Sequence, residues 1–345
     1  MKQKFCVALI SFIVAVSLSG CVHDYPAMTP DGEDGVDPTL VEVSTDVVLD
    51  LELVPLEIVT PVVVRSGGGR AESAYSRRFI IEAWHEGRAV SRQMSIVDDA
   101  GDDSTGMIRV PIRLKLHALE YTLLVWTDFV AADSTGDLFY DTGNLKRVSC
   151  RDPYTGSTDY RDCLYGTTVL DLRPYRDEWN ASVEVKVDMA RPLGKYELIA
   201  TDVKDFLRKT KKLRDGNESF TITFYYGFYL PTVFNVLSGK PEDSQTGVQY
   251  TVPLEVPADG SEECTVGSDF VFVNGSESSV NLSMEIRDGS GNVLSRTNGL
   301  DIPFQRGHLT TVRARFLTNG MQGGVEIDDE FSGDVDVDLD GLLDF

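Results

Sequence analysis

A long alternation of apolar and polar residues is the feature that most constrains how this chain can fold. Between residues 41 and 53, every second position is apolar apart from one threonine: Val41, Val43, Thr45, Val47, Leu49, Leu51 and Leu53. The positions between them are mostly Glu, Ser or Asp. Successive side chains of a β-strand point to opposite sides, so this pattern predicts a long strand with one buried face.

Similar patterns recur along the rest of the chain and predict a β-rich fold. Further strands are expected at residues 78–86, 107–116, 121–129, 181–189, 219–229, 248–256, 270–273, 280–286 and 309–316. One short helix is expected after Thr201-Asp202, because Val203, Phe206 and Leu207 form an apolar stripe. Short strands separated by turn residues, with one helix, predict an all-β chain of two tandem β-sandwich domains, residues 39–190 and 191–345.

The first residues carry the pattern of a bacterial lipoprotein signal. Lys2 and Lys4 precede an apolar stretch, and Leu18-Ser19-Gly20 places small residues directly before Cys21. We therefore expect a signal peptide over residues 1–20 and a lipidated Cys21 at the mature N-terminus, anchored by several acyl chains. The alternative is an ordinary secretory signal that happens to precede a cysteine. Residues 21–38 are rich in Pro, Gly and acids and predict a flexible tether.

The charge of the chain excludes some classes of partner. The formal net charge is −23, and removal of the two signal lysines makes the mature chain −25. Nucleic acids and anionic lipid headgroups bind basic surfaces, so neither is expected as a partner. An acidic chain of this kind suits a soluble, mutually repelling surface protein.

Residues that could carry chemistry show no convincing grouping. Cys150 and Cys163 flank a polar loop and could form one disulfide outside the cytoplasm, which leaves Cys264 unpaired. No C-x-x-C or histidine-rich spacing predicts a metal site, and the acidic loops lack the ligand spacing of a calcium loop. The four histidines share no catalytic motif. We therefore expect no enzyme, no metal and no cofactor.

The C-terminal segment is a strand with one apolar and one strongly acidic side. Val335, Val337 and Leu339 alternate with aspartates. Such a strand either closes the second sandwich or pairs with another chain. We expect these three apolar residues to form the face that binds a partner.

Five segments, taken in order, resemble a known family. They are YTLLVWTD at 121–128, RDCLYG at 161–166, RPLGKYE at 191–197, YLPTVFNV at 229–236 and DDEFSGD at 328–334. On a lipoprotein, this series resembles the fimbrillin-associated anchor and minor-subunit lipoproteins of Bacteroidales, together with a related family of uncharacterised lipoproteins. The resemblance implies two transthyretin-like β-sandwich domains and a role in type V fimbriae, in which a strand of one subunit completes the sheet of its neighbour.

The resemblance also sets the functional expectations. We expect a lipid-anchored structural component, an anchor or minor subunit, of a cell-surface fimbria at the outer membrane, with fimbrial subunits as partners through strand addition. Fibre subunits of this kind lose an N-terminal strand to an arginine-specific protease, and Arg65, Arg70, Arg77 and Arg78 lie in or near an accessible loop.

The alternative function is a surface lipoprotein that binds glycans or another extracellular ligand. Its aromatic side chains would include Trp84, Trp126 and Trp179. Because large aromatic residues in strands usually pack in a core, this alternative ranks second.

Overall fold

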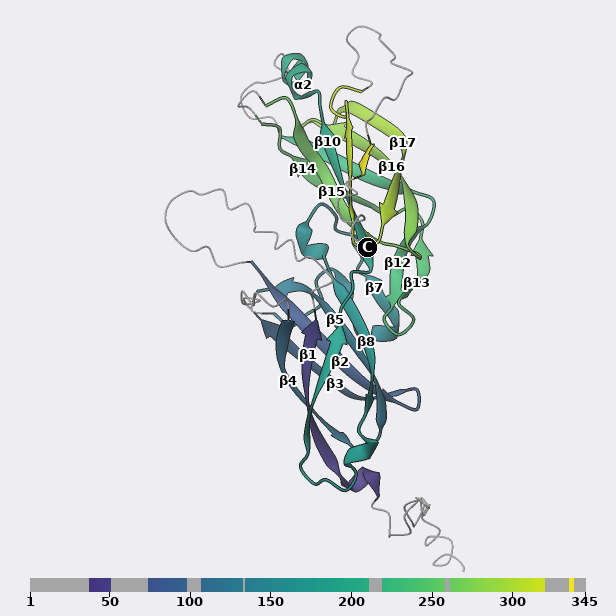
Figure 1. Ribbon diagram of the computed structural model, residues 1–345. Helices are drawn as coiled ribbons and strands as arrows, with labels where there is room; N and C mark the ends of the chain where they lie inside the picture. The colour runs from purple at the N-terminus through teal and green to yellow at the C-terminus, as the bar shows by residue number, and fades with distance from the viewer. Residues whose placement is uncertain are drawn as a thin grey trace, which may run out of the picture.

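The computed structural model describes residues 37–50, 74–97, 107–132, 134–210, 219–257, 261–319 and 335–337. The predicted signal peptide, Cys21 and almost all of the predicted tether lie outside these residues. The chain is all-β, as predicted, and its strands form two lobes arranged end to end (Figure 1). We call the described residues up to 190 the N-terminal lobe and those from 191 onwards the C-terminal lobe.

Two sheets build the N-terminal lobe. The first has the order β4 (Met107–His117), β1 (Glu42–Asp50) and β9 (Ser182–Asp188). The second has the order β3 (Arg88–Val97), β2 (Tyr75–His85), β5 (Glu120–Ala131) and β8 (Leu164–Asp171). Strand β1 runs antiparallel to β4 and parallel to β9.

The predicted alternation in the first strand is confirmed from Glu42 to Val47, whereas all four residues from Val47 to Asp50 are buried. Val43, Thr45, Val47 and Leu49 are completely buried in β1, and Val41 is buried directly before it. The four apolar residues among them and apolar residues of the facing sheet belong to one hydrophobic cluster that reaches as far as Met189. The pleat of the strand thus places this apolar face in the core of the lobe.

Two further sheets and the helix build the C-terminal lobe. One sheet has the order β15 (Cys264–Phe272), β10 (Leu193–Ala200), β18 (Leu309–Ala314) and β19 (Val335–Val337). The other has the order β14 (Gln249–Leu254), β11 (Phe220–Gly227), β16 (Glu277–Arg287) and β17 (Val293–Gln305). Helix α2 (Val203–Thr210) is the predicted helix, and it is the one α-helix of the described residues.

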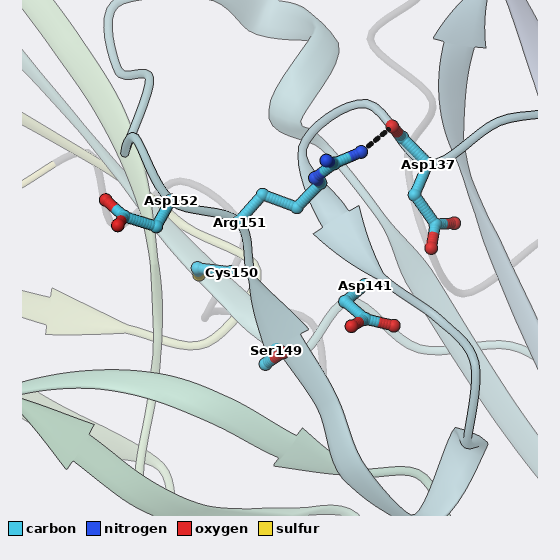
Figure 2. A pocket seen from close by; sticks show the side chains of 6 residues that line it. All are labelled: Asp137, Asp141, Ser149, Cys150, Arg151 and Asp152. Atoms are coloured by element: carbon cyan, nitrogen blue, oxygen red, sulfur yellow. Dashed lines mark hydrogen bonds between the residues drawn. The ribbon is translucent and has the colours of Figure 1, made fainter.

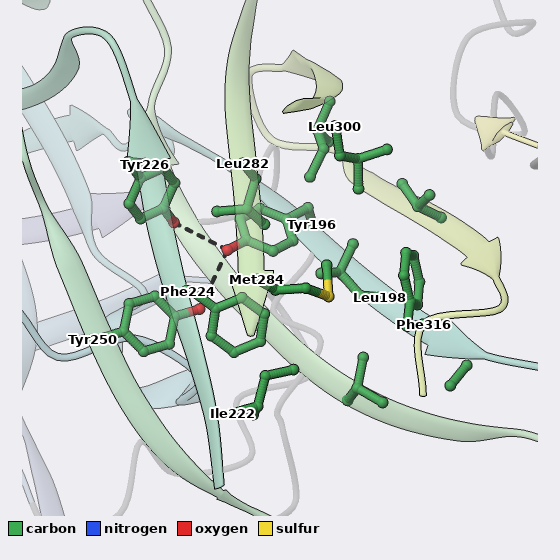
Figure 3. Packing of buried hydrophobic residues seen from close by; sticks show 14 of the residues in the cluster. Tyr196, Leu198, Ile222, Phe224, Tyr226, Tyr250, Leu282, Met284, Leu300 and Phe316 are labelled. Carbon is green, nitrogen blue, oxygen red and sulfur yellow. Dashed lines mark hydrogen bonds between the residues drawn. The ribbon is translucent and has the colours of Figure 1, made fainter. Parts of the chain in front are cut away.

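The core of the C-terminal lobe contains polar as well as apolar side chains (Figure 3). Leu198, Phe224 and Met284 pack between the two sheets. The buried hydroxyl of Tyr196 lies 3.1 Å from the hydroxyl of Tyr226 and 3.2 Å from that of Tyr250. Buried hydroxyls are costly without partners, so this three-tyrosine network satisfies groups that the apolar core would otherwise penalise.

A fifth sheet joins the two lobes, and it was not predicted. Its order is β13 (Lys240–Gln245), β12 (Leu230–Asn235), β7 (Val148–Cys150) and β6 (Tyr140–Asp141). Strand β12 of the C-terminal lobe pairs with β7 of the N-terminal lobe at Phe234↔Val148 and Val233↔Ser149. Backbone hydrogen bonding therefore crosses the junction between the lobes.

A separate hydrophobic cluster lies beneath this sheet. It combines residues from both lobes, including Trp126, Tyr140, Phe234 and Phe272. The ring of Phe234 stacks on that of Phe272 at 5.4 Å between centroids, and Trp126 lies 6.2 Å from Phe234. The junction is thus packed as a core of its own rather than as a loose contact.

A buried ion pair also connects the two lobes. Arg161 ends the turn η3 (Asp159–Arg161) of the N-terminal lobe, and its Nε lies 3.3 Å from Oδ1 of Asp269 in β15. Both side chains are almost completely buried. The hydroxyls of Tyr154 and Tyr226 donate to Oδ2 of Asp269 at 2.9 and 2.7 Å. Burial raises the pKa of Asp269, and the positive charge of Arg161 and the two phenol donors oppose that shift.

Candidate partner-binding surface

The C-terminal strand lies at the edge of its own sheet. Residues Val335 and Val337 belong to β19, which pairs antiparallel with β18, whereas Leu339 lies outside the described residues. The register places Val335 opposite Val312 and Val337 opposite Thr310, two residues whose side chains are buried. The sequence left two alternatives for this strand, closing the second sandwich or pairing with another chain. In the structure the strand closes the second sandwich.

The pairing of β19 is much shorter than the other pairings of its sheet. Over the described residues it comprises three residue pairs, whereas β10 pairs with β15 through eight and with β18 through six. On its other side, β18 is covered by β10 along its whole length. In the described residues, one short strand therefore covers the backbone groups along this edge of β18. An edge of this kind can accept a strand from another chain.

Two exposed aromatic residues mark the corner between β11 and β12. Phe228 is 78% exposed and Tyr229 is 75% exposed. Phe228 has a φ of 59°, a backbone conformation that bulky residues rarely adopt. Phe224 and Tyr226 of the same strand are buried, whereas Phe228 is exposed because the strand ends at Gly227, two residues short of the predicted end at 229, and the chain turns.

Two of the arginines considered as protease sites are not in a loop. Arg77 and Arg78 lie in strand β2, and the Arg78 side chain is only 2% exposed. Its guanidinium donates to both carboxylate oxygens of Asp128, at 2.8 and 2.6 Å, and to Asp137 at 2.8 Å. The expectation that a protease could reach this site is therefore wrong for Arg78. Arg65 and Arg70 lie outside the described residues.

The cysteines of the described residues are free thiols, so the structure does not contain the disulfide expected between Cys150 and Cys163. The Sγ atom of Cys150 faces Nη2 of Arg161 at 3.6 Å, and Cys163 lies in the hydrophobic cluster of the junction. Burial raises the pKa of both thiols, which keeps them protonated and poorly nucleophilic at neutral pH. Pairing of the two residues in an oxidising compartment stays a prediction.

A small polar depression of about 320 Å³ lies beside Cys150 (Figure 2). Its lining residues come from the strands β6 and β7 and their neighbouring loops: Asp137, Asp141, Ser149, Cys150, Arg151 and Asp152. The Arg151 guanidinium crosses it and donates to the backbone carbonyl of Asp137. Its acids do not form a group that could hold a metal ion, and the same is true of the His, Cys, Asp and Glu side chains elsewhere in the described residues.

The described part of the chain contains no helix that is both long and apolar enough to cross a membrane.

A family model described as a family of unknown function, DUF6562, matches residues 38–340. The chain belongs to this family. The matched region includes both lobes and β19, so the whole described fold falls within the DUF6562 family. No curated protein matches the chain.

Solved structures resemble this DUF6562 chain at low sequence identity. The fimbrial anchor protein Mfa2 from Porphyromonas gingivalis is 12% identical, with 79% of this chain and 89% of that chain covered and a TM-score of 0.37. A candidate cell adhesion protein from Bacteroides eggerthii is 12% identical, with 86% and 94% covered and a TM-score of 0.41. A candidate polysaccharide-binding protein from Bacteroides thetaiotaomicron is 8% identical, with 84% and 100% covered and a TM-score of 0.42.

Proposed function

We propose that this protein is a lipid-anchored structural component of a cell-surface fimbria, held at the outer membrane through Cys21 and joined to neighbouring subunits by strand addition. The C-terminal segment with Val335, Val337 and Leu339 is the strand that adds to the neighbour. Residues 39–190 and 191–345 are the two β-sandwich domains. The sequence resemblance to fimbrial anchor and minor-subunit lipoproteins supports the lipid anchor and the type of assembly.

The proposal rests on the shortness of β19, the strand that pairs with the edge of β18. In the described residues three residue pairs hold β19 in place, and each net backbone hydrogen bond contributes only about 1 kcal/mol. Removing this strand from its sheet therefore costs little compared with unfolding the lobe, whose core lies between β10, β11 and their neighbours. A strand held this weakly can exchange between its own sheet and that of a neighbour.

Truncation tests the strand-addition step. Removal of residues 334–345 is expected to abolish co-purification of the protein with fimbrial subunits from cell envelopes, while circular dichroism and the Tm show that the remainder stays folded. The control is the double substitution Asp336→Ser and Asp338→Ser, which keeps the apolar alternation and should keep assembly. Unchanged assembly of the truncated protein would refute the donated strand.

Glycan binding through the tryptophans is the weaker alternative. Trp126 is completely buried, and the ammonium group of Lys146 lies 3.6 Å above the ring of Trp84. A sugar platform needs open aromatic faces, and these two residues do not provide them, which leaves Trp179 as the one widely exposed tryptophan of the three.

A further inference from the structure

Three segments form the end of the N-terminal lobe that follows the predicted tether. We call these three segments the basal pole. They are the turn η1 (Pro38–Leu40), the β4–β5 turn at 118–119 and the loop 172–181 with its turn η4 (Arg173–Tyr175). The amide of Ala118 donates to the carbonyls of Pro38 and Val41, and the amide of Leu172 donates to that of Leu119. Figure 1 shows η1 and η4 together at the end of this lobe, opposite the C-terminal lobe.

Two large apolar side chains project from the basal pole. Trp179 is 63% exposed and Leu40 is 65% exposed. Leu40 precedes Ser44 by four residues and Trp179 precedes Ser182 by three, and Ser44 and Ser182 are neighbours in the parallel strands β1 and β9. Both side chains therefore leave the fold at the same end. Of the three tryptophans of the chain, only Trp179 is exposed to this degree.

The loop that carries Trp179 is held in place by contacts of its own. Tyr175 packs against the core of the lobe, the amide of Glu178 donates to the carbonyl of Tyr175, and the amide of Ala181 donates to that of Glu178. Asn180 adopts a φ of 63°, which turns the chain back into β9. The indole is thus presented outwards by an ordered turn, so its exposure does not result from a loose end.

The basal pole is nearly neutral in a strongly acidic protein. Its fifteen residues, 38–40, 118–119 and 172–181, contain two arginines and two acids, a net charge of zero, whereas the full chain carries −23. Arg173 pairs with Asp171 at 2.8 Å and also with Glu120, so its charge is balanced locally. A nearly neutral patch with exposed apolar groups suits a zwitterionic surface better than the acidic remainder of the protein does.

The length of chain before the fold places this pole close to the lipid anchor. Sixteen residue steps separate Cys21 from Asp37, where the described structure begins. Such a segment spans at most about 58 Å when extended. Tethering holds the pole at a high effective concentration near the bilayer, where a weak apolar contact is enough to keep it there.

We propose that the basal pole is a membrane-contact surface that binds the interfacial region of a zwitterionic phospholipid leaflet. The indole of Trp179 lies at the level of the headgroups, where tryptophan is favoured because its ring is apolar and its N–H finds polar partners. Leu40 inserts beside it. The N-terminal lobe then stands on the membrane and the β18 edge faces away from it. This inference rests on the proposed lipid anchor.

Fluorescence quenching in vesicles tests the inference. The full chain, lipidated and purified from membranes, is reconstituted into phosphatidylcholine vesicles whose acyl chains carry bromine, a quencher that acts only at short range. We expect quenching of tryptophan emission in the parent protein and its loss in Trp179→Phe. The matched control Trp84→Phe removes a partly covered tryptophan of the same lobe and should retain the quenching. In the unaltered chain, vesicles should also protect Trp179 from the soluble quencher acrylamide.

The outcomes separate this inference from the proposed function. Mass spectrometry that finds no lipid on Cys21 overturns both. A lipidated Cys21 with equal quenching in Trp179→Phe and the parent, and no protection from acrylamide, overturns the membrane contact and leaves the fimbrial anchor in place. Emission of Trp179 that responds to soluble surface polysaccharide and not to vesicles assigns the pole to a glycan and also overturns the membrane contact.

Discussion

Replacing Arg161 by methionine is expected to lower the free energy of unfolding by about 3–5 kcal/mol, the usual cost of removing one partner of a buried ion pair. The substitution leaves the carboxylate of Asp269 buried, with the phenols of Tyr154 and Tyr226 and one backbone amide as its partners. It also removes the donor to the carbonyl of Thr155 and the guanidinium that lies 4.0 Å from the ring of Tyr154. A loss of this size is a large part of the 5–15 kcal/mol that typically separates folded from unfolded domains.

A double-mutant cycle isolates the contribution of the pair. Adding Asp269→Asn to Arg161→Met removes the uncompensated charge and should recover part of the stability, so the two losses should not add. Arg147→Met is the matched control, because Arg147 pairs with Asp243 across the same junction at 2.9 Å but both side chains are more than half exposed. This control should have no measurable effect, since exposed pairs contribute little.

Urea unfolding monitored by intrinsic fluorescence provides the assay, because the buried Trp126 lies in the junction cluster and reports on its integrity. Small-angle X-ray scattering of each variant in the absence of urea would show whether the lobes separate. If Arg161→Met costs no more than Arg147→Met, or if the two substitutions of the cycle are additive, the buried pair does not hold the junction and the reasoning fails.

Three further predictions follow from single sites. Gly156→Ala should cost about 1–3 kcal/mol, because its Cβ would lie 2.4 Å from the ring of Tyr250, whereas Gly136→Ala, with its nearest atom at 3.4 Å, should be neutral in the same unfolding assay. The pKa of Glu285 is lowered, because hydrogen bonds from Arg296 and Arg287 outweigh its burial. Its contribution to stability is therefore present above pH 4.5 and lost as the pH falls, so Glu285→Gln should destabilise the protein at pH 7 and much less at pH 3. The thiol of Cys163, completely buried and with a raised pKa, should resist alkylation until urea unfolds the protein, and rapid labelling of the folded protein would contradict its placement in the junction.

Local patterns predicted the elements whose burial repeats with the period of a strand. The alternation in β1 and the apolar stripe of α2 each depend on neighbouring residues, so the sequence contains the whole signal. The two-sandwich, all-β architecture follows from the number of such segments.

The features that lie between lobes depend on pairs of residues far apart in the sequence, and local patterns do not contain them. Strand β7 has three residues, and its partner Phe234 lies 86 positions after Val148. The burial of Arg78 was not predicted, because its partner Asp128 is 50 positions away. Arg161 and Asp269 are likewise 108 positions apart, and no periodicity connects them. The exposure of Trp179 could not be predicted either, because a tryptophan beside a strand is more often core.

The sheet that combines β12 with β7 has a mechanical consequence. In the proposed function the protein is tethered at one end and bound at the other, so it is under tension whenever the cell is sheared by flow, and that tension must pass through whatever joins its two halves. Here the join consists of paired backbone, stacked rings and a buried ion pair, all of which must break together before the lobes can swing apart. A molecule joined in this way transmits a pulling force with little extension until the force is large enough to unfold it.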